Sequence, residues 1–176
     1  LAEEKALPLI IEAAGDAEPS VRFEAVHSLG RYLIDFNSDV KDRAFSQLSR
    51  YVNPRRESKP AIRQAAIKAL RFSPEERANL AVARAAVADP DSATREMAAD
   101  ALVLWNSGHS ERALLEMLSD DVWRVRKAAA RSISRFVSRH GMHESQAVCE
   151  ALVRISRMFP SFSKERQLAE GVLSSL

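Results

Sequence analysis

Few side chains in this sequence have the type and spacing that chemistry requires. His140 lies close to the pair His143–Glu144, and together with His109 these residues offer loosely spaced donors of the kind that bind transition metals. This spacing is only loosely like that of a metal site, and a loop of polar residues is the better interpretation. The single cysteine, Cys149, has no identifiable base partner, and we interpret it as a small apolar core residue.

Other catalytic patterns are not discernible either. The sequence shows no Gly-rich phosphate loop, no paired catalytic carboxylates and no Ser–His–Asp arrangement. It has no apolar run of membrane-spanning length and no signal peptide. We therefore expect no metal, no cofactor, no small-molecule substrate, no catalytic activity and no membrane partner, and we expect a cytoplasmic protein.

Basic residues, in contrast, are concentrated. The net charge is only +2, yet the segment 122–143 contains no acid and six Lys or Arg residues. Five of them recur at intervals of three or four, which places them in one stripe along a helix, opposite apolar residues. This basic stripe consists of Arg124, Lys127, Arg131, Arg135 and Arg139. A second basic cluster around residues 50–71 includes Lys68 and Arg71.

The basic stripe has three interpretations. It is a solvated helix face, a docking groove for an acidic peptide or protein, or a surface for the phosphate backbone of nucleic acid. Few aromatic residues are available to stack on bases, and the acidic residues Glu96 and Asp100 would repel phosphates. The sequence leaves all three open.

A separate set of arginines recurs in similar phrases and predicts the helices that carry the basic residues. Each arginine of the set is followed by Ala three residues later and by Leu or Ile seven residues later, at spacings of 41, 32, 31 and 40; the set is Arg22, Arg63, Arg95, Arg126 and Arg166. Positions 0, +3 and +7 share one face of an α-helix, and a period of this size is typical of stacked supersecondary units.

Each arginine phrase is the second helix of a pair. An acid stands six residues before the arginine in four repeats, at Asp16, Glu57, Asp89 and Asp120, and prolines follow several of these acids, as helix starts often do. Residues 73–76 (Ser-Pro-Glu-Glu) read as a capping box that opens the first helix of the third pair. We count ten helices in five antiparallel pairs, with no long period-two alternation that would predict a sheet.

The sequence resembles the HEAT-repeat family. Residues 7–22 follow the HEAT pattern almost throughout, with a proline inside the first helix and an Asp before the Val-Arg, and residues 89–102 and 120–133 match nearly as well. The resemblance implies an all-α, right-handed α-solenoid, here one domain over residues 1–176, with repeats at about 1–35, 38–72, 74–107, 109–140 and 143–176. Because the chain starts at Leu1 almost inside a helix, we expect a fragment of a longer protein.

The resemblance also implies roles for the repeated charges. In the family, the arginine of one repeat bonds the acid of a neighbour, which predicts a structural ladder of Asp16, Arg22, Arg63, Asp89, Arg95, Asp120 and Arg126. Second helices line the concave face of such solenoids, so Lys68 and Arg131, in equivalent positions, would face a partner there.

These features predict a non-catalytic scaffold that binds a protein or acidic peptide. Nucleic-acid binding through the basic stripe is the alternative. A HEAT-like DNA glycosylase is a weaker one, because such an enzyme gathers an acid and aromatic residues in a cleft, and Trp123, at the start of its helix, is expected to pack against the preceding repeat instead.

Overall fold

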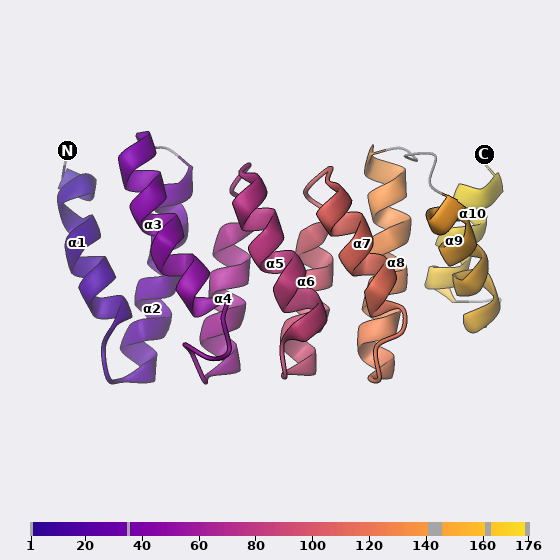
Figure 1. The fold of residues 1–176 in the computed structure, drawn as a ribbon, viewed down its shortest axis with the longest axis horizontal. Coiled ribbons are helices and arrows are strands. Elements are labelled where there is room, and N and C mark those ends of the chain that lie inside the picture. Colours follow the sequence, from indigo (N-terminus) through magenta and orange to yellow (C-terminus); the bar gives the residue numbers. More distant parts are fainter. Residues whose placement is uncertain (1, 35, 141–145, 161–162, 175–176) are drawn as a thin grey trace.

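The chain folds as a row of helix pairs (Figure 1). The computed structural model describes residues 2–34, 36–140, 146–160 and 163–174. The first helices of the five pairs are α1 (Ala2–Ala14), α3 (Ser38–Tyr51), α5 (Glu76–Ala88), α7 (Gly108–Met117) and α9 (Gln146–Met158). The second helices are α2 (Pro19–Leu29), α4 (Pro60–Leu70), α6 (Ser92–Leu102), α8 (Trp123–His140) and α10 (Lys164–Ser174), and a short 3₁₀ helix, η1 (Gly30–Leu33), follows α2.

The pairs stack side by side into two layers. First helices pack on first helices, from α1 through α9, and second helices pack on second helices, from α2 through α10. Figure 1 shows the two layers, with the termini at opposite ends of the row. The described ranges contain ten α-helices and no strand, so the all-α solenoid predicted from the sequence is confirmed.

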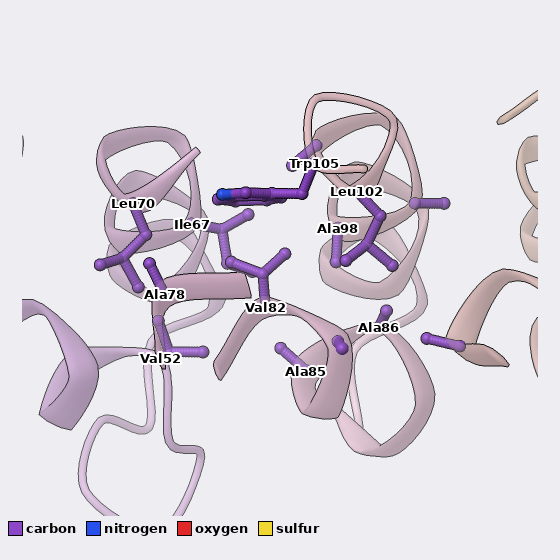
Figure 2. Close-up of a cluster of buried hydrophobic side chains, with 14 of the residues drawn as sticks. Val52, Ile67, Leu70, Ala78, Val82, Ala85, Ala86, Ala98, Leu102 and Trp105 are labelled. Atoms are coloured by element: carbon purple, nitrogen blue, oxygen red, sulfur yellow. The ribbon is translucent and has the colours of Figure 1, made fainter. Parts of the chain in front are cut away.

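The repeated Ala and Leu positions form the core between the layers. The alanines three residues after the ladder arginines are at most 6% exposed, and Leu29, Leu70 and Leu102, seven residues after them, are fully buried. Figure 2 shows one section of this core, where Ile67 and Leu70 of α4 and Leu102 of α6 lie with Val82 of α5 and the indole of Trp105. Small alanines let the helices approach closely, and the larger aliphatic side chains fill the remaining space.

Close approach is clearest at Gly30, the first residue of η1. A Cβ added to this glycine would lie 2.9 Å from the Cβ of Ala69 and 3.2 Å from its Cα. Because glycine has no Cβ, the end of the first repeat can pack closely on α4 at this position. The contact places Ile34 beside the C-terminal end of α4, at a groove described below.

Most helix starts follow the expected chemistry, with one exception. Pro19 and Pro60 occupy the first positions of α2 and α4, where a missing N–H costs nothing. The capping box predicted at 73–76 is wrong, because α5 begins at Glu76. Ser73 is buried instead in the turn that closes α4, and its carbonyl oxygen accepts the indole N–H of Trp105 at 2.8 Å. That tertiary contact fixes Ser73 before the helix starts.

Candidate functional site

Three arginines join successive repeats through bidentate carboxylate bonds. The guanidinium group of Arg22 donates to Glu57 at 2.9 and 3.2 Å. Arg63 donates to Asp89 at 2.7 Å through two nitrogens, and Arg95 donates to Asp120 at 2.7 and 3.0 Å. Each arginine thus reaches the acid of the following repeat, and Glu57 takes the place of the aspartate in the second repeat.

Every rung has the same local support. The remaining guanidinium nitrogen donates to two carbonyl oxygens of the preceding inter-helix turn, at the positions six and five residues before the arginine; for Arg63 these are Glu57 O and Ser58 O. The acid in turn accepts the backbone N–H two residues later, as Asp89 does from Asp91 at 2.9 Å. The ladder therefore ties the turns together as well as the repeats.

The middle rung, Arg63–Asp89, is the most deeply buried of the three ion pairs. The side chains of Arg63 and Asp89 are 2% and 0% exposed, against 12% and 9% for Arg95 and Asp120. The hydrogen bonds to Asp89 raise the pKa of Arg63 and outweigh its burial. Arg95 lowers the pKa of the Asp120 carboxyl through its hydrogen bonds, although partial burial opposes this shift. Both groups are thus held charged inside the stack.

Within the described residues, the ladder runs from the first repeat to the fourth. Asp16 accepts the Glu18 N–H at 2.7 Å, as the other ladder acids accept theirs, but no arginine partner for it lies among the described residues. Arg126 donates to the carbonyl oxygens of Asp120 and Asp121, and no acidic partner for it lies in the described ranges. The position that would carry this acid is Pro160. Ion pairs of Asp16 and Arg126, which the ladder predicts, are therefore not seen within the described residues.

The basic stripe lies on α8, and this α8 stripe has more ion-pair partners than the sequence indicates. Four of its five cations lie against acids of the neighbouring second helices: Arg124 near Glu96 at 3.5 Å, Lys127 near Glu165 at 3.6 Å, and Arg131 and Arg135 near Asp100 at 3.1 and 3.4 Å. Glu96 and Asp100, which the sequence marked as interrupting the basic surface, neutralise part of it from α6. For Arg139, which is exposed, no ion pair is seen within the described residues.

The other basic cluster surrounds an exposed aromatic ring. Phe72, just after α4, is 54% exposed, and the guanidinium group of Arg71 lies 4.5 Å from the centre of its ring. Lys68 is exposed one turn earlier. A groove of about 380 Å³ between the first and second repeats, the Phe72 groove, is lined by His27, Gly30, Arg31, Ile34, Ala65, Lys68, Ala69, Arg71 and Phe72.

Phe72 was not singled out from the sequence. The available signal was an aromatic residue directly after Arg71, two positions beyond the last buried residue of α4, where the helical pattern no longer requires an apolar side chain. Ile34, 50% exposed, has the same character after η1. Both exposed side chains therefore mark a surface that the arginine register does not explain.

The two described histidines that the sequence offered as metal ligands contact other partners. His109 lies 3.4 Å from Glu76, and the ring of His140 bonds Val103 O at 2.8 Å. His143 and Glu144 lie outside the described residues. Within the described ranges, no group of three or more His, Cys, Asp or Glu residues could hold a metal ion.

Trp123 packs on an aromatic ring of the following repeat. Its ring lies 5.1 Å from that of Phe159, which follows α9, and it is 44% exposed. Contact with the preceding repeat, which the sequence predicts, stays a prediction. Arg126 also lies 5.3 Å from the indole ring.

No helix among the described residues has the length and apolar character needed to cross a membrane.

The comparisons with known proteins agree with this geometry. A family model described as HEAT repeats matches residues 80–158, which include α6, α7 and α8, and this confirms the resemblance in the sequence. A structure of an engineered protein superposes with a TM-score of 0.65 at 18% identity, covering 96% of this chain and 78% of that chain.

A structure from the complex of CpcE and CpcF of phycocyanin lyase from Nostoc sp. PCC7120 gives a TM-score of 0.53 at 18% identity, covering 95% of this chain and 75% of that chain. At this identity, both likenesses concern the fold. No curated protein matches the sequence. Over residues 80–158 the chain is thus similar to HEAT repeats, and the described helices form one stack of such pairs, a fold that suggests a scaffold or interaction role.

Proposed function

We propose that this chain is a non-catalytic scaffold that binds an acidic segment of a partner protein on the face formed by its second helices. The observation that carries the proposal is the Phe72 groove. It combines the exposed side chains of Phe72 and Ile34 with the cations Lys68 and Arg71, around a groove with a volume of about 380 Å³. Aromatic and basic side chains around a groove are a typical anchor for a peptide that pairs one apolar side chain with carboxylates.

The α8 stripe extends this surface along the second helices. Arg124, Lys127, Arg131 and Arg135 already have acids near them, so a partner would have to compete with Glu96, Asp100 and Glu165 for these cations. Arg139 has no such neighbour in the described part of the chain. We infer that the stripe contributes to the approach and register of an acidic partner, while the Phe72 groove provides the anchor.

The same neutralisation argues against the nucleic-acid alternative. Binding to a phosphate backbone draws on several uncompensated cations at once, and its strength falls steeply with salt. Asp100 lies between Arg131 and Arg135 on the surface and would be placed against phosphates. A short peptide avoids this carboxylate, because it needs only the Phe72 groove.

Selection from a displayed library of random twelve-residue peptides tests the proposal. We expect peptides enriched on the wild type to contain Asp or Glu together with an aromatic or aliphatic residue. The double variant Lys68→Glu/Arg71→Glu should lose at least tenfold in affinity for these peptides, and Phe72→Ala should lose a similar amount. Arg112→Glu, an exposed reversal on α7, is the matched control and should bind as the wild type does.

Two results would overturn the proposal. One is enrichment of peptides without acidic residues. The other is equal binding to the wild type and to both groove variants when circular dichroism shows that all are folded. Double-stranded DNA of unrelated sequence serves as the competitor. Displacement of the selected peptides by DNA at physiological salt would favour the nucleic-acid alternative instead.

A further inference from the structure

A second groove lies on the opposite layer, between the first helices α3 and α5, which are neighbours in Figure 1. This Phe45 groove has a volume of about 550 Å³, within the range of small-molecule sites. Its apolar lining includes Phe45, Val52, Leu80 and Ala81, and three arginines, Arg55, Arg77 and Arg84, lie around it. None of these residues belongs to the surface proposed above.

The groove owes its shape to the inter-helix segment of the second repeat. Residues 52–59 join α3 to α4, whereas the corresponding segments of the first, third and fourth repeats are the shorter runs 15–18, 89–91 and 118–122. The longer segment is folded on Asn53, whose side chain accepts the Arg55 N–H at 2.9 Å and whose carbonyl accepts the Arg56 N–H at 2.9 Å. Its far end is held by Glu57 in the ladder. Arg55 therefore projects from a fixed turn.

The charge around the groove is not balanced. Arg77 is paired with Glu75 and Asp42 and lies 4.1 Å from the centre of the Phe45 ring. The one carboxylate in the lining, Asp89, already takes two hydrogen bonds from Arg63. Arg55 and Arg84 are exposed, and neither has an ion pair within the described residues. Two uncompensated guanidinium groups thus lie beside an apolar floor.

We propose that the Phe45 groove is a binding site for a small amphipathic anion, one that carries a carboxylate, sulfonate or phosphate beside an aromatic or aliphatic group. The apolar group would cover Phe45, Leu80 and Ala81, where burial is favourable. The anionic group would lie between Arg55 and Arg84, which can bind it through charge-assisted hydrogen bonds. The inference is independent of the peptide surface on the second helices.

Comparison with another apolar groove, which has no arginine in its lining, supports an anionic ligand for the Phe45 groove. The groove at the first repeat is lined by Leu9, Ile10 and Val21 among others, and its one charged residue is the acid Glu24. An uncharged apolar molecule would enter either groove. Of these two grooves, an amphipathic anion would prefer the Phe45 groove, because arginines line that one and not the groove at the first repeat.

Two matched dyes test the proposal. The probes are 8-anilinonaphthalene-1-sulfonate and its uncharged analogue N-phenyl-1-naphthylamine, titrated by fluorescence and located by amide shifts in NMR spectra. We expect the sulfonate to bind one site, with shifts at Phe45, Leu80 and Ala81, and at least tenfold more tightly than the analogue. Arg55→Glu/Arg84→Glu should weaken sulfonate binding at least tenfold and leave binding of the analogue within about twofold.

Arg43→Glu, an exposed reversal on α3 outside the groove, is the control and should bind both dyes as the wild type does. If the double reversal does not fold, Arg55→Gln/Arg84→Gln replaces it with the same expected direction. Three results would overturn the proposal: equal affinity for the two dyes, sulfonate binding unchanged in the folded arginine variant, or shifts confined to residues 6–28.

Discussion

The buried rung Arg63–Asp89 allows the cost of breaking the ladder to be worked out. Asp89→Ala removes two hydrogen bonds of 2.7 Å and leaves Arg63, 2% exposed, with only its bonds to Glu57 O and Ser58 O. Removing one partner of a buried ion pair costs about 3–5 kcal/mol, because the remaining charge is neither paired nor hydrated. We expect Asp89→Ala to lower the free energy of unfolding by that amount.

Substitutions of two other ladder acids separate the contribution of the arginine bonds to this free-energy cost from that of the turn bond. Asp16 makes the same turn bond to a backbone N–H but has no arginine partner among the described residues, so Asp16→Ala should cost about 1 kcal/mol or less. Asp120→Ala should cost about 1–3 kcal/mol, because Arg95 is 12% exposed and water can reach it. The difference between the Asp89 and Asp16 variants isolates the arginine bonds from the turn.

Urea unfolding followed by circular dichroism measures the series, with equal m-values required for the comparison. The expected order of loss is Asp89, then Asp120, then Asp16. Arg63→Met/Asp89→Leu, which replaces both partners by apolar side chains, should recover most of the stability lost in Asp89→Ala. The reasoning would be refuted if Asp16→Ala and Asp89→Ala lost the same amount, since the arginine bonds would then contribute nothing.

Two further perturbations test the packing and the charges of the stack. Gly30→Ala should destabilise by about 1–3 kcal/mol, because the new methyl group would lie 2.9 Å from the Cβ of Ala69; a thermal melt equal to that of the wild type would show that η1 can shift freely. The ladder also predicts a pH dependence. Arg95 lowers the pKa of Asp120, and Arg22, with the Lys59 N–H, lowers that of Glu57 against the opposing effect of burial. Because both pKa values are depressed in the folded state, their stabilisation is complete above the unfolded values near pH 4 and is lost as the pH falls below them. The fall in urea stability from about pH 4 to pH 2 should be shallower in Asp120→Ala, and an identical slope would contradict the assigned pKa shift.

The helix pairs were predictable from sequence because the repeat encodes packing directly. Arg, Ala and Leu at 0, +3 and +7 set which face of each second helix is buried, and that constraint holds in every repeat. The rungs were predictable in kind, but their direction was not. Sequence spacing shows that Arg63 and Asp89 lie in neighbouring repeats; only the stacking shows that each arginine reaches forward. Given that direction, Asp16 would need an arginine of a preceding repeat and Arg126 an acid at the position of Pro160, and neither has such a partner among the described residues.

The start of α5 was not predictable, because its determinant is distant in sequence. Ser73 has the composition of an N-cap, and local preferences alone favour a helix from Pro74. The indole N–H of Trp105, 32 residues later, bonds the Ser73 carbonyl and holds this residue in the preceding turn. A buried donor needs a partner, and this requirement outweighs a capping preference of about 1 kcal/mol.

In a stack of this kind, whether a basic residue on the surface is neutralised depends more on the acids of the adjacent helix in the same layer than on the residues of its own helix. Arg131 occupies the same repeat position as Asp100, one repeat earlier, and the two side chains form an ion pair where α8 packs on α6. A run of basic residues on one helix is therefore partly neutralised wherever the adjacent repeat is acidic at the same positions. Cations keep their attraction for a ligand where the repeat pattern is broken, as it is by the long segment that carries Arg55 and by the exposed ring beside Arg71. We therefore propose that ligands bind at these irregular places rather than along the regular stripe.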